Sequence, residues 1–290
     1  MPEVSSRSES EERFSGPALL EVSGLVVDFG GVQALDDVAL KADPGSIVGV
    51  IGPNGSGKTT LLNVISGIVK PTGGSVRVGG EELVDFLPEE RRDVGVVRSF
   101  QDCLLFPDLS VEDTLLLTKD AKKSTSVTST TLQAPWARRS EREKREAVDR
   151  VITVFGLDRF RNHPTSHLST GTRRVVDLAS IALADPRLLL LDEPTAGIAQ
   201  REAEAFMPLI RRLHEAADTT ILIVEHDVPL VFGLCSKVVV MEAGRVVASG
   251  SPDEVKRDPR ALAAYLGASD EALAVSGPAS DTSINRSGRD

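Results

Sequence analysis

A glycine-rich segment restricts the possible folds of this 290-residue chain more than any other feature. Residues 52–59 match the pattern G-x-x-x-x-G-K-[ST], which binds phosphate through backbone N–H groups in a tight turn. The apolar run Ile47–Ile51 predicts a buried strand before it. Residues 59–70 predict a helix after it, whose apolar face would contain Leu61, Val64, Ile65 and Ile68. A chance glycine-rich turn is the alternative, but the flanking strand and helix favour a phosphate loop at a helix N-terminus, where anions bind.

Within this loop the residue types have separate tasks. The glycines permit the tight turn. Lys58 would reach the β- and γ-phosphates of a nucleotide, and the Thr59 hydroxyl would hold Mg²⁺. The predicted nucleotide-binding residues are therefore Gly52, Pro53, Asn54, Gly55, Ser56, Gly57, Lys58, Thr59 and Thr60.

Two further predicted strands end in polar residues. Residues 188–191 lead into Asp192 and Glu193, and buried charges at a strand end are costly unless a metal or hydrogen bonds compensate. Beside a phosphate loop, Asp192 would hold Mg²⁺ through water and Glu193 would polarise the attacking water. A solvated strand end is the alternative. The strand 220–224 is followed by His226, which would contact the γ-phosphate or position water, although a single histidine is more often structural.

Hydrophobic patterning predicts an α/β fold. Short β-rich runs fill residues 18–100, and helical spacing prevails from 111 to about 177. Two apolar strands separated by a helical segment at 201–216 then predict a parallel sheet with crossover helices. We expect a phosphate-loop NTPase core of mostly parallel sheet, with an antiparallel β subdomain and a helical subdomain. The other expected strands are Leu20–Val22, Leu25–Phe29, Val38–Lys41, Ser75–Val78, Lys237–Met241 and Arg245–Ser249, the last two joined by a hairpin turn at residues 242–244.

Domain boundaries follow from composition. One nucleotide-binding domain is expected at residues 18–267, with its helical subdomain at about 102–177 and an exposed Ser/Thr-rich loop at 119–135. Residues 1–17 and 268–290 are rich in small and polar residues, which predicts disorder.

Charge and cysteine content exclude other classes of protein. Acidic residues outnumber basic ones by 43 to 33, and no basic patch predicts a nucleic-acid partner. Residues 138–150 interleave arginines with acids and predict an ion-paired, solvated helix face. Cys103 and Cys235 fit buried thiols in a reducing compartment. Without a signal-peptide pattern or a long apolar run, we expect a cytosolic chain that reaches a membrane only through a partner.

In this order the segments resemble the ATP-binding subunit of ABC transporters, over residues 18–267. The resemblance implies an ATPase with ATP and Mg²⁺ as cofactors. Ser99-Phe100-Gln101 resembles the family's glutamine loop, which implies that Gln101 contacts Mg²⁺ and the attacking water. Phe29 resembles the aromatic residue that stacks on adenine, whereas a phenylalanine without this context would be assigned to the core. The implied catalytic residues are Glu193, His226 and Gln101, and the implied metal ligands are Thr59, Gln101 and Asp192.

Residues 168–172 resemble the family's signature motif, LSGGQ, and match it at Ser169 and Gly171. In the family this motif caps ATP bound to the opposite subunit, which implies a head-to-tail dimer with a second, identical or different, ATP-binding subunit. Thr170 and Thr172 replace the motif's usual third and fifth residues, and Ala199 stands where the family often has Asp. These departures imply fewer contacts across the dimer.

Further segments resemble the branched-chain amino acid importer type, at residues 29–35, 98–101, 105–111 and 258–267. This resemblance implies transmembrane permease subunits, an extracytoplasmic solute-binding protein and a location on the inner face of the cell membrane. The transported compound and the direction of transport are not encoded in these motifs. A soluble ABC ATPase and a nucleotide-dependent regulator without transport are the alternatives. The former commonly has two nucleotide domains or a long coiled-coil insertion, and this chain has one set of motifs.

Overall fold

The computed structural model describes residues 18–99, 105–121, 135–197 and 200–264. Gln101, Cys103 and Ala199 lie outside these ranges, as do both terminal segments and most of the predicted loop at 119–135. The predictions made for them are therefore not tested by the fold.

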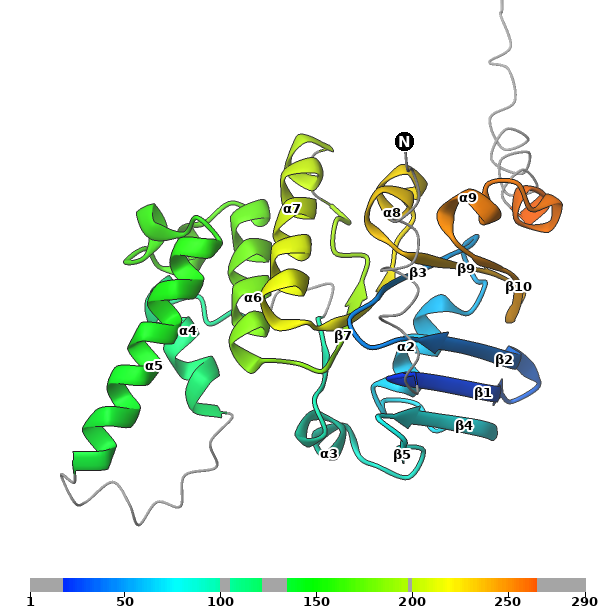
Figure 1. Ribbon diagram of the computed structural model, residues 1–290, viewed down its shortest axis with the longest axis horizontal. Helices are drawn as coiled ribbons and strands as arrows, with labels where there is room; N and C mark the ends of the chain where they lie inside the picture. The colour runs from blue at the N-terminus through cyan, green and yellow to red at the C-terminus, as the bar shows by residue number, and fades with distance from the viewer. Residues whose placement is uncertain (1–17, 100–104, 122–134, 198–199, 265–290) are drawn as a thin grey trace, which may run out of the picture.

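The central layer is a six-stranded sheet that is parallel except for its edge hairpin (Figure 1). Its spatial order is β10 (Arg245–Gly250), β9 (Lys237–Glu242), β3 (Ile47–Ile51), β8 (Thr220–Val224), β7 (Leu188–Asp192) and β6 (Val96–Arg98). The strands β3, β7 and β8 are buried along their whole length, because both faces of the sheet are covered. Alternate side chains enter opposite cores: Val48 and Val50 join one, Ile47 and Ile51 the other.

A four-stranded antiparallel sheet covers one face of this layer, with α2 (Lys58–Ile65) sharing the core between the two sheets (Figure 1). Its order is β2 (Val32–Ala42), β1 (Leu20–Phe29), β4 (Gly73–Val78) and β5 (Glu81–Glu82). The two strands predicted at 20–22 and 25–29 are one strand, β1. A register shift between Val22 and Leu25, around Gly24 with φ 59°, absorbs the interruption as a bulge.

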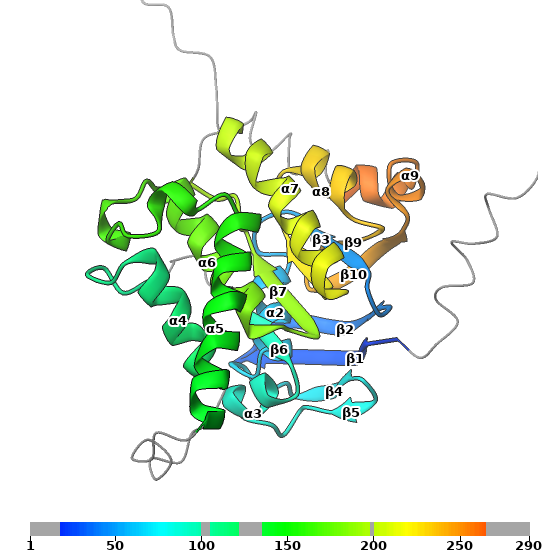
Figure 2. The same ribbon diagram turned by 60° about the vertical axis from the view of Figure 1, so that its left-hand side comes forward.

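Helices cover the opposite face, and three of them stand together at one end of the molecule (Figures 1 and 2). These three are α4 (Val111–Ala121), α5 (Pro135–Val154) and α6 (Thr170–Ala184), the last of which continues past residue 177. Also present are α3 (Pro88–Asp93), α7 (Gln200–Ala217), α8 (Val228–Leu234), α9 (Pro252–Val255) and two short 3₁₀ turns, Asp158–Phe160 and Thr165–His167. The predicted ion-paired face of α5 is confirmed by contacts of Arg142 with Glu146 and of Lys144 with Glu141.

Helix α2 is shorter than predicted, because Gly67 adopts φ 84° and ends it after Ile65 instead of near Lys70. The backbone N–H groups of Ile68 and Val69 both donate to the carbonyl of Asn63, which completes the helix end. The prediction that Ile68 shares the buried face was wrong, since this side chain is 51% exposed.

The β9–β10 hairpin is confirmed, with Ala243 at φ 45° and Gly244 at φ 77° in its turn. Cys235 is buried, as expected, and burial raises the pKa of its thiol to about 12. Within the described ranges, no helix is both long enough and apolar enough to cross a membrane.

Candidate active site

The phosphate loop, residues 52–59, joins β3 to α2 as predicted. Lys58 is the first residue of α2, and its side chain folds back into the loop, where Nζ donates to the carbonyl oxygens of Gly52 and Pro53 at 2.8 Å each. Burial lowers the pKa of Lys58, while the negative charges of Glu193 and Asp192 raise it. The ammonium group therefore lies within electrostatic reach of both predicted strand-end carboxylates.

Close packing requires two of the loop glycines. Gly52 has φ 154°, and a Cβ atom there would lie 2.1 Å from the carbonyl oxygen of Met241 on β9. Gly57, with φ 99° at the N-cap of α2, would bring a Cβ atom to 2.7 Å from the carbonyl oxygen of Ala34 on β2. Strands of both sheets thus pack closely against the loop. Its tip, residues 54–55, stays exposed to solvent.

Three neighbouring strands end beside this loop. Val224 on β8 lies opposite Val50 on β3 and opposite Asp192 on β7, so the carboxyl ends of the three strands meet at one edge of the sheet. The backbone N–H of Glu193 donates to the carbonyl of Val224 at 2.9 Å, which continues the pairing by one residue. The structure therefore brings Asp192, Glu193 and His226 together, as the sequence predicts.

Asp192 has one engaged and one unengaged carboxylate oxygen. Its Oδ2 accepts a hydrogen bond from Arg98 at 2.8 Å, whereas its buried Oδ1 has no hydrogen-bond partner in the described part of the chain. An oxygen of this kind fits a cation or a bound water. Among the described residues no cluster of three His, Cys, Asp or Glu side chains could hold a metal alone. The site therefore suits Mg²⁺, which is commonly bound through one or two carboxylates together with phosphate and water.

Glu193 and His226 are in direct contact, with Oε1 of the carboxylate 2.5 Å from Nε2 of the ring. Glu193 has φ 47°, a left-handed conformation that is uncommon outside glycine. The chain therefore turns sharply at the strand end. The half-exposed imidazole orients a carboxylate whose chemistry suits removal of a proton from water.

Two side chains that the sequence analysis did not single out hold the turn after Glu193. Arg174 on α6 donates to the carbonyl groups of Pro194 and Ala196. Glu225 is buried and accepts hydrogen bonds from the backbone N–H and the hydroxyl of Thr195. The position of Glu225 directly after the apolar strand β8 could have indicated a functional acid. Nothing in the sequence around Arg174 sets it apart from the other arginines of the chain.

The predicted signature segment lies on the surface at the N-terminus of α6. Ser169 is exposed and caps the helix, since its Oγ accepts from the backbone N–H of Thr172 at 3.2 Å. The same Oγ lies 3.0 Å from the Thr172 hydroxyl. Thr170 is also exposed and Gly171 is half-buried. Among the described residues, no hydrogen bond joins this segment to the phosphate loop.

Phe29 ends β1 and is 53% exposed. It pairs with Val32 at the end of the β1–β2 hairpin, and Ala34 and Leu35 further along β2 contact Gly57 of the phosphate loop. The core role considered for Phe29 was wrong, because its side chain is more than half exposed.

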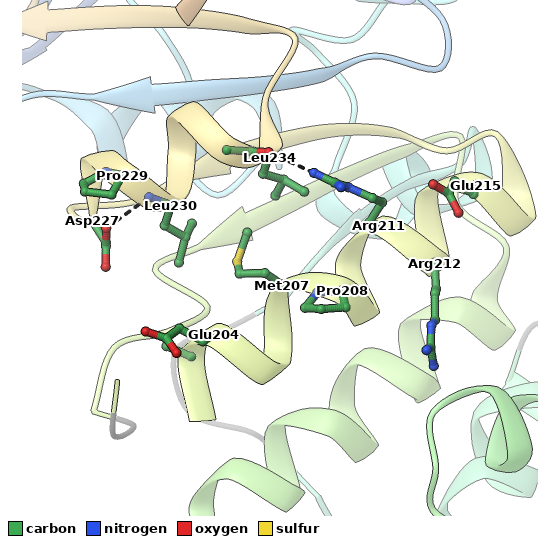
Figure 3. A pocket seen from close by; sticks show the side chains of 12 residues that line it. Glu204, Met207, Pro208, Arg211, Arg212, Glu215, Asp227, Pro229, Leu230 and Leu234 are labelled. Carbon is green, nitrogen blue, oxygen red and sulfur yellow. Dashed lines mark hydrogen bonds between the residues drawn. The ribbon is translucent and has the colours of Figure 1, made fainter. Parts of the chain in front are cut away.

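A further cavity of about 560 Å³ lies between α7 and α8 (Figure 3). Met207 and Leu230 face one another across it, and Arg211 donates to the carbonyl of Gly233 at 2.8 Å (Figure 3). Its lining contains none of the predicted site residues.

Comparison with known proteins identifies the family. The sequence profile described as "ABC transporter" matches residues 35–196, more than half of the chain. The chain is 36% identical over 249 residues to the high-affinity branched-chain amino acid transport ATP-binding protein BraF of Pseudomonas aeruginosa, covering 86% of this chain and 98% of the relative. The chain belongs to the ABC transporter family. The corresponding protein LivG of Escherichia coli is 37% identical over 252 residues, with the same coverage.

Solved structures of ABC ATP-binding cassettes share the fold. A nucleotide-free cassette superposes with a TM-score of 0.72 at 27% identity, covering 86% of this chain and 99% of that one. A cassette in its ADP conformation gives a TM-score of 0.73 at 27% identity, covering 87% and 100%. A profile described as "Branched-chain amino acid ATP-binding cassette transporter" also matches residues 245–271.

The family and the fold confirm the expected phosphate-loop NTPase architecture. This ABC protein is an ATP-binding, ATP-hydrolysing subunit of a transporter. The alternatives of a soluble ABC ATPase and of a regulator without transport are not supported, because similarity to transporter subunits extends over 86% of the chain.

Proposed function

We propose that this ABC subunit powers the import of branched-chain amino acids, or of a related small solute, by hydrolysing ATP between two subunits. BraF and LivG, at 36% and 37% identity, carry that solute class in their names. The match of residues 245–271 to a branched-chain amino acid cassette profile adds independent support near the end of the chain. The nucleotide-binding domain is assigned to residues 18–267, with the helical subdomain at about 102–177 and flanking segments 1–17 and 268–290.

The contact between Glu193 and His226 is the observation that supports the hydrolytic mechanism most directly. The loop residues 52–60 bind the phosphates, Lys58 offsets the charge on the β- and γ-phosphates, and Phe29 stacks on adenine. Glu193 accepts a proton from the attacking water as its oxygen bonds to the γ-phosphorus. The bond from that phosphorus to the bridging oxygen breaks, giving ADP and phosphate.

His226 orients Glu193 in this mechanism and contacts the γ-phosphate. Asp192, Thr59 and Gln101 would hold Mg²⁺, which supplies neutralisation of phosphate charge when bound. The unengaged Oδ1 of Asp192 supports this assignment. Gln101 is assigned from the family resemblance alone, since it lies outside the described residues.

A second ATP-binding subunit, identical or different, would complete each site in a head-to-tail dimer. The exposed Ser169, whose hydrogen bonds stay within its own helix end, supports this arrangement, with Gly171 beside it. Transmembrane permease subunits and an extracytoplasmic solute-binding protein are the further proposed partners. They would place the chain on the inner face of the cell membrane.

Reconstitution tests the proposal. We would co-express the chain with permease subunits of the branched-chain amino acid importer type, incorporate the complex into liposomes with internal ATP and Mg²⁺, and measure uptake of radiolabelled leucine. We expect uptake that requires the solute-binding protein, is competed by isoleucine and valine, and is lost with Glu193→Gln. The proposal would be contradicted if isoleucine and valine did not lower the rate of leucine uptake. It would also be contradicted if the rate were the same with Glu193→Gln.

A further inference from the structure

Arg98 connects three elements at the end of β6. One terminal nitrogen of its guanidinium donates to Oδ2 of Asp192 on β7 at 2.8 Å. The other donates to Oδ1 of Asn63 at 2.7 Å and to Oγ of Ser66 at 3.1 Å, at the C-terminal end of α2. The side chains of the ion pair are only 7% and 5% exposed, for Arg98 and Asp192 respectively. The planar guanidinium of Arg98 thus joins the end of β6 to the Asp192 carboxylate and to α2, the helix after the phosphate loop.

The geometry restricts how Asp192 can turn. A guanidinium is a rigid planar fork, and anchoring one side of it on α2 fixes the direction in which the other side donates. The carboxylate that accepts this bond therefore presents a defined oxygen, Oδ1, which is buried without a hydrogen-bond partner in the described residues. Without Arg98, the buried carboxylate would lose the ion pair on Oδ2, and no hydrogen bond among the described residues would fix which oxygen faces which way.

We propose that Arg98 is a positioning residue that holds Asp192 with Oδ1 directed to the magnesium site. This inference rests on the proposed role of Asp192 as a metal ligand. Partners that orient a metal ligand typically change metal affinity by about 10- to 100-fold when removed. Arg98 thereby contributes to Mg²⁺ binding without touching the metal or the nucleotide.

The competing explanation is that Arg98 only anchors α2, and Arg91 provides a matched control. Arg91 is also buried and also bonds to the end of α2, donating to the carbonyl groups of Val64 and Ile65. Its hydrogen bonds in the described chain go to backbone carbonyls and not to a strand-end carboxylate. Loss of either arginine should destabilise the same end of α2. Only loss of Arg98 should leave the Asp192 carboxylate free to rotate.

The test measures Mn²⁺ binding, as an EPR-visible substitute for Mg²⁺, to the full chain with a non-hydrolysable ATP analogue. The variants are Arg98→Met, Arg98→Lys, Arg91→Met and Asp192→Asn. Nucleotide affinity is also measured in EDTA, and every titration is made below the melting temperature of the variant. We expect Arg98→Met to weaken Mn²⁺ binding by about 10- to 100-fold, with unchanged nucleotide affinity in EDTA. Arg91→Met should melt earlier but bind Mn²⁺ like the wild type.

Arg98→Lys keeps a cation that can contact Asp192, so we expect a smaller loss than with Arg98→Met. It also carries the test if Arg98→Met does not fold. Equal Mn²⁺ affinity in the Arg98 variants and Arg91→Met would overturn the inference, as would an equal loss of nucleotide affinity in EDTA, which would place the effect in the phosphate loop. If Asp192→Asn weakens Mn²⁺ binding while the Arg98 variants do not, only this inference fails. If Asp192→Asn has no effect either, the proposed metal site itself fails.

Discussion

The strand-end cluster and the N-terminus of α6 both contain predicted nucleotide-binding residues, yet they are supported in opposite ways. At the strand ends, Asp192 is held by Arg98 on another strand, and Glu193 contacts His226 from a third. At α6, Ser169 is exposed, and its side-chain hydrogen bonds among the described residues stay within its own helix end, with Thr172. The strand-end residues are therefore held by contacts within the chain, whereas the exposed residues of the signature segment are the ones that the proposed second subunit would contact.

Lys58→Ala provides the most severe test of the residues held within the chain. We expect loss of ATP binding and turnover in a folded protein, because Lys58 supplies the positive charge inside the phosphate loop. Nucleotide titration and circular dichroism measure the two properties. Lys70→Ala is the matched control, since Lys70 is exposed and its ion pair in the described part of the chain is with Asp85 on the surface. Wild-type nucleotide affinity and turnover in folded Lys58→Ala would show that the loop does not depend on this charge.

Glu193→Gln should retain ATP binding and slow hydrolysis by roughly 10²-fold or more, the scale of a lost general base. Phosphate release measures the rate, and light scattering with ATP should reveal an accumulated dimer, because assembly is no longer followed by cleavage. Glu204→Gln, on the exposed side of α7, is the control. A monomeric Glu193→Gln protein with the wild-type rate would remove Glu193 from the base role.

Phe29→Ala tests an exposed residue that we propose stacks on the adenine bound by the same chain. Loss of stacking should weaken ATP binding by about 1–3 kcal/mol, the magnitude found for bases on aromatic rings. Stability should hardly change, because Phe29 is 53% exposed. Val32→Ala is the matched control, since Val32 is its cross-strand neighbour and is 68% exposed. A thermal melt paired with a nucleotide titration separates the two effects, and equal affinities in both variants would count against stacking.

The smallest expected effect concerns the exposed signature segment. Thr170→Gly with Thr172→Gln restores the family's signature residues and removes the hydroxyl that lies 3.0 Å from Ser169 Oγ. One regained hydrogen bond contributes about 0.5–1.5 kcal/mol, so ATP-driven dimerisation should tighten by roughly 2- to 10-fold for each site that regains one. The dimer dissociation constant is measured on the Glu193→Gln background, so that hydrolysis does not interfere. A weaker or unchanged dimer would show that these threonines cost the interface no contact.

The sequence by itself determined the phosphate loop, the two carboxylates at the end of β7 and the signature segment. Each of these depends on residue types at adjacent positions, because a tight turn, a buried strand and a helix start have local requirements. Only the tertiary structure decided which distant side chains form hydrogen bonds with these segments. Gly67 ended α2 before Lys70, and the bond from Arg98 to Asp192 spans 94 residues of sequence. Such partners are chosen by the packing of distant strands and helices, which spacing along the chain does not record.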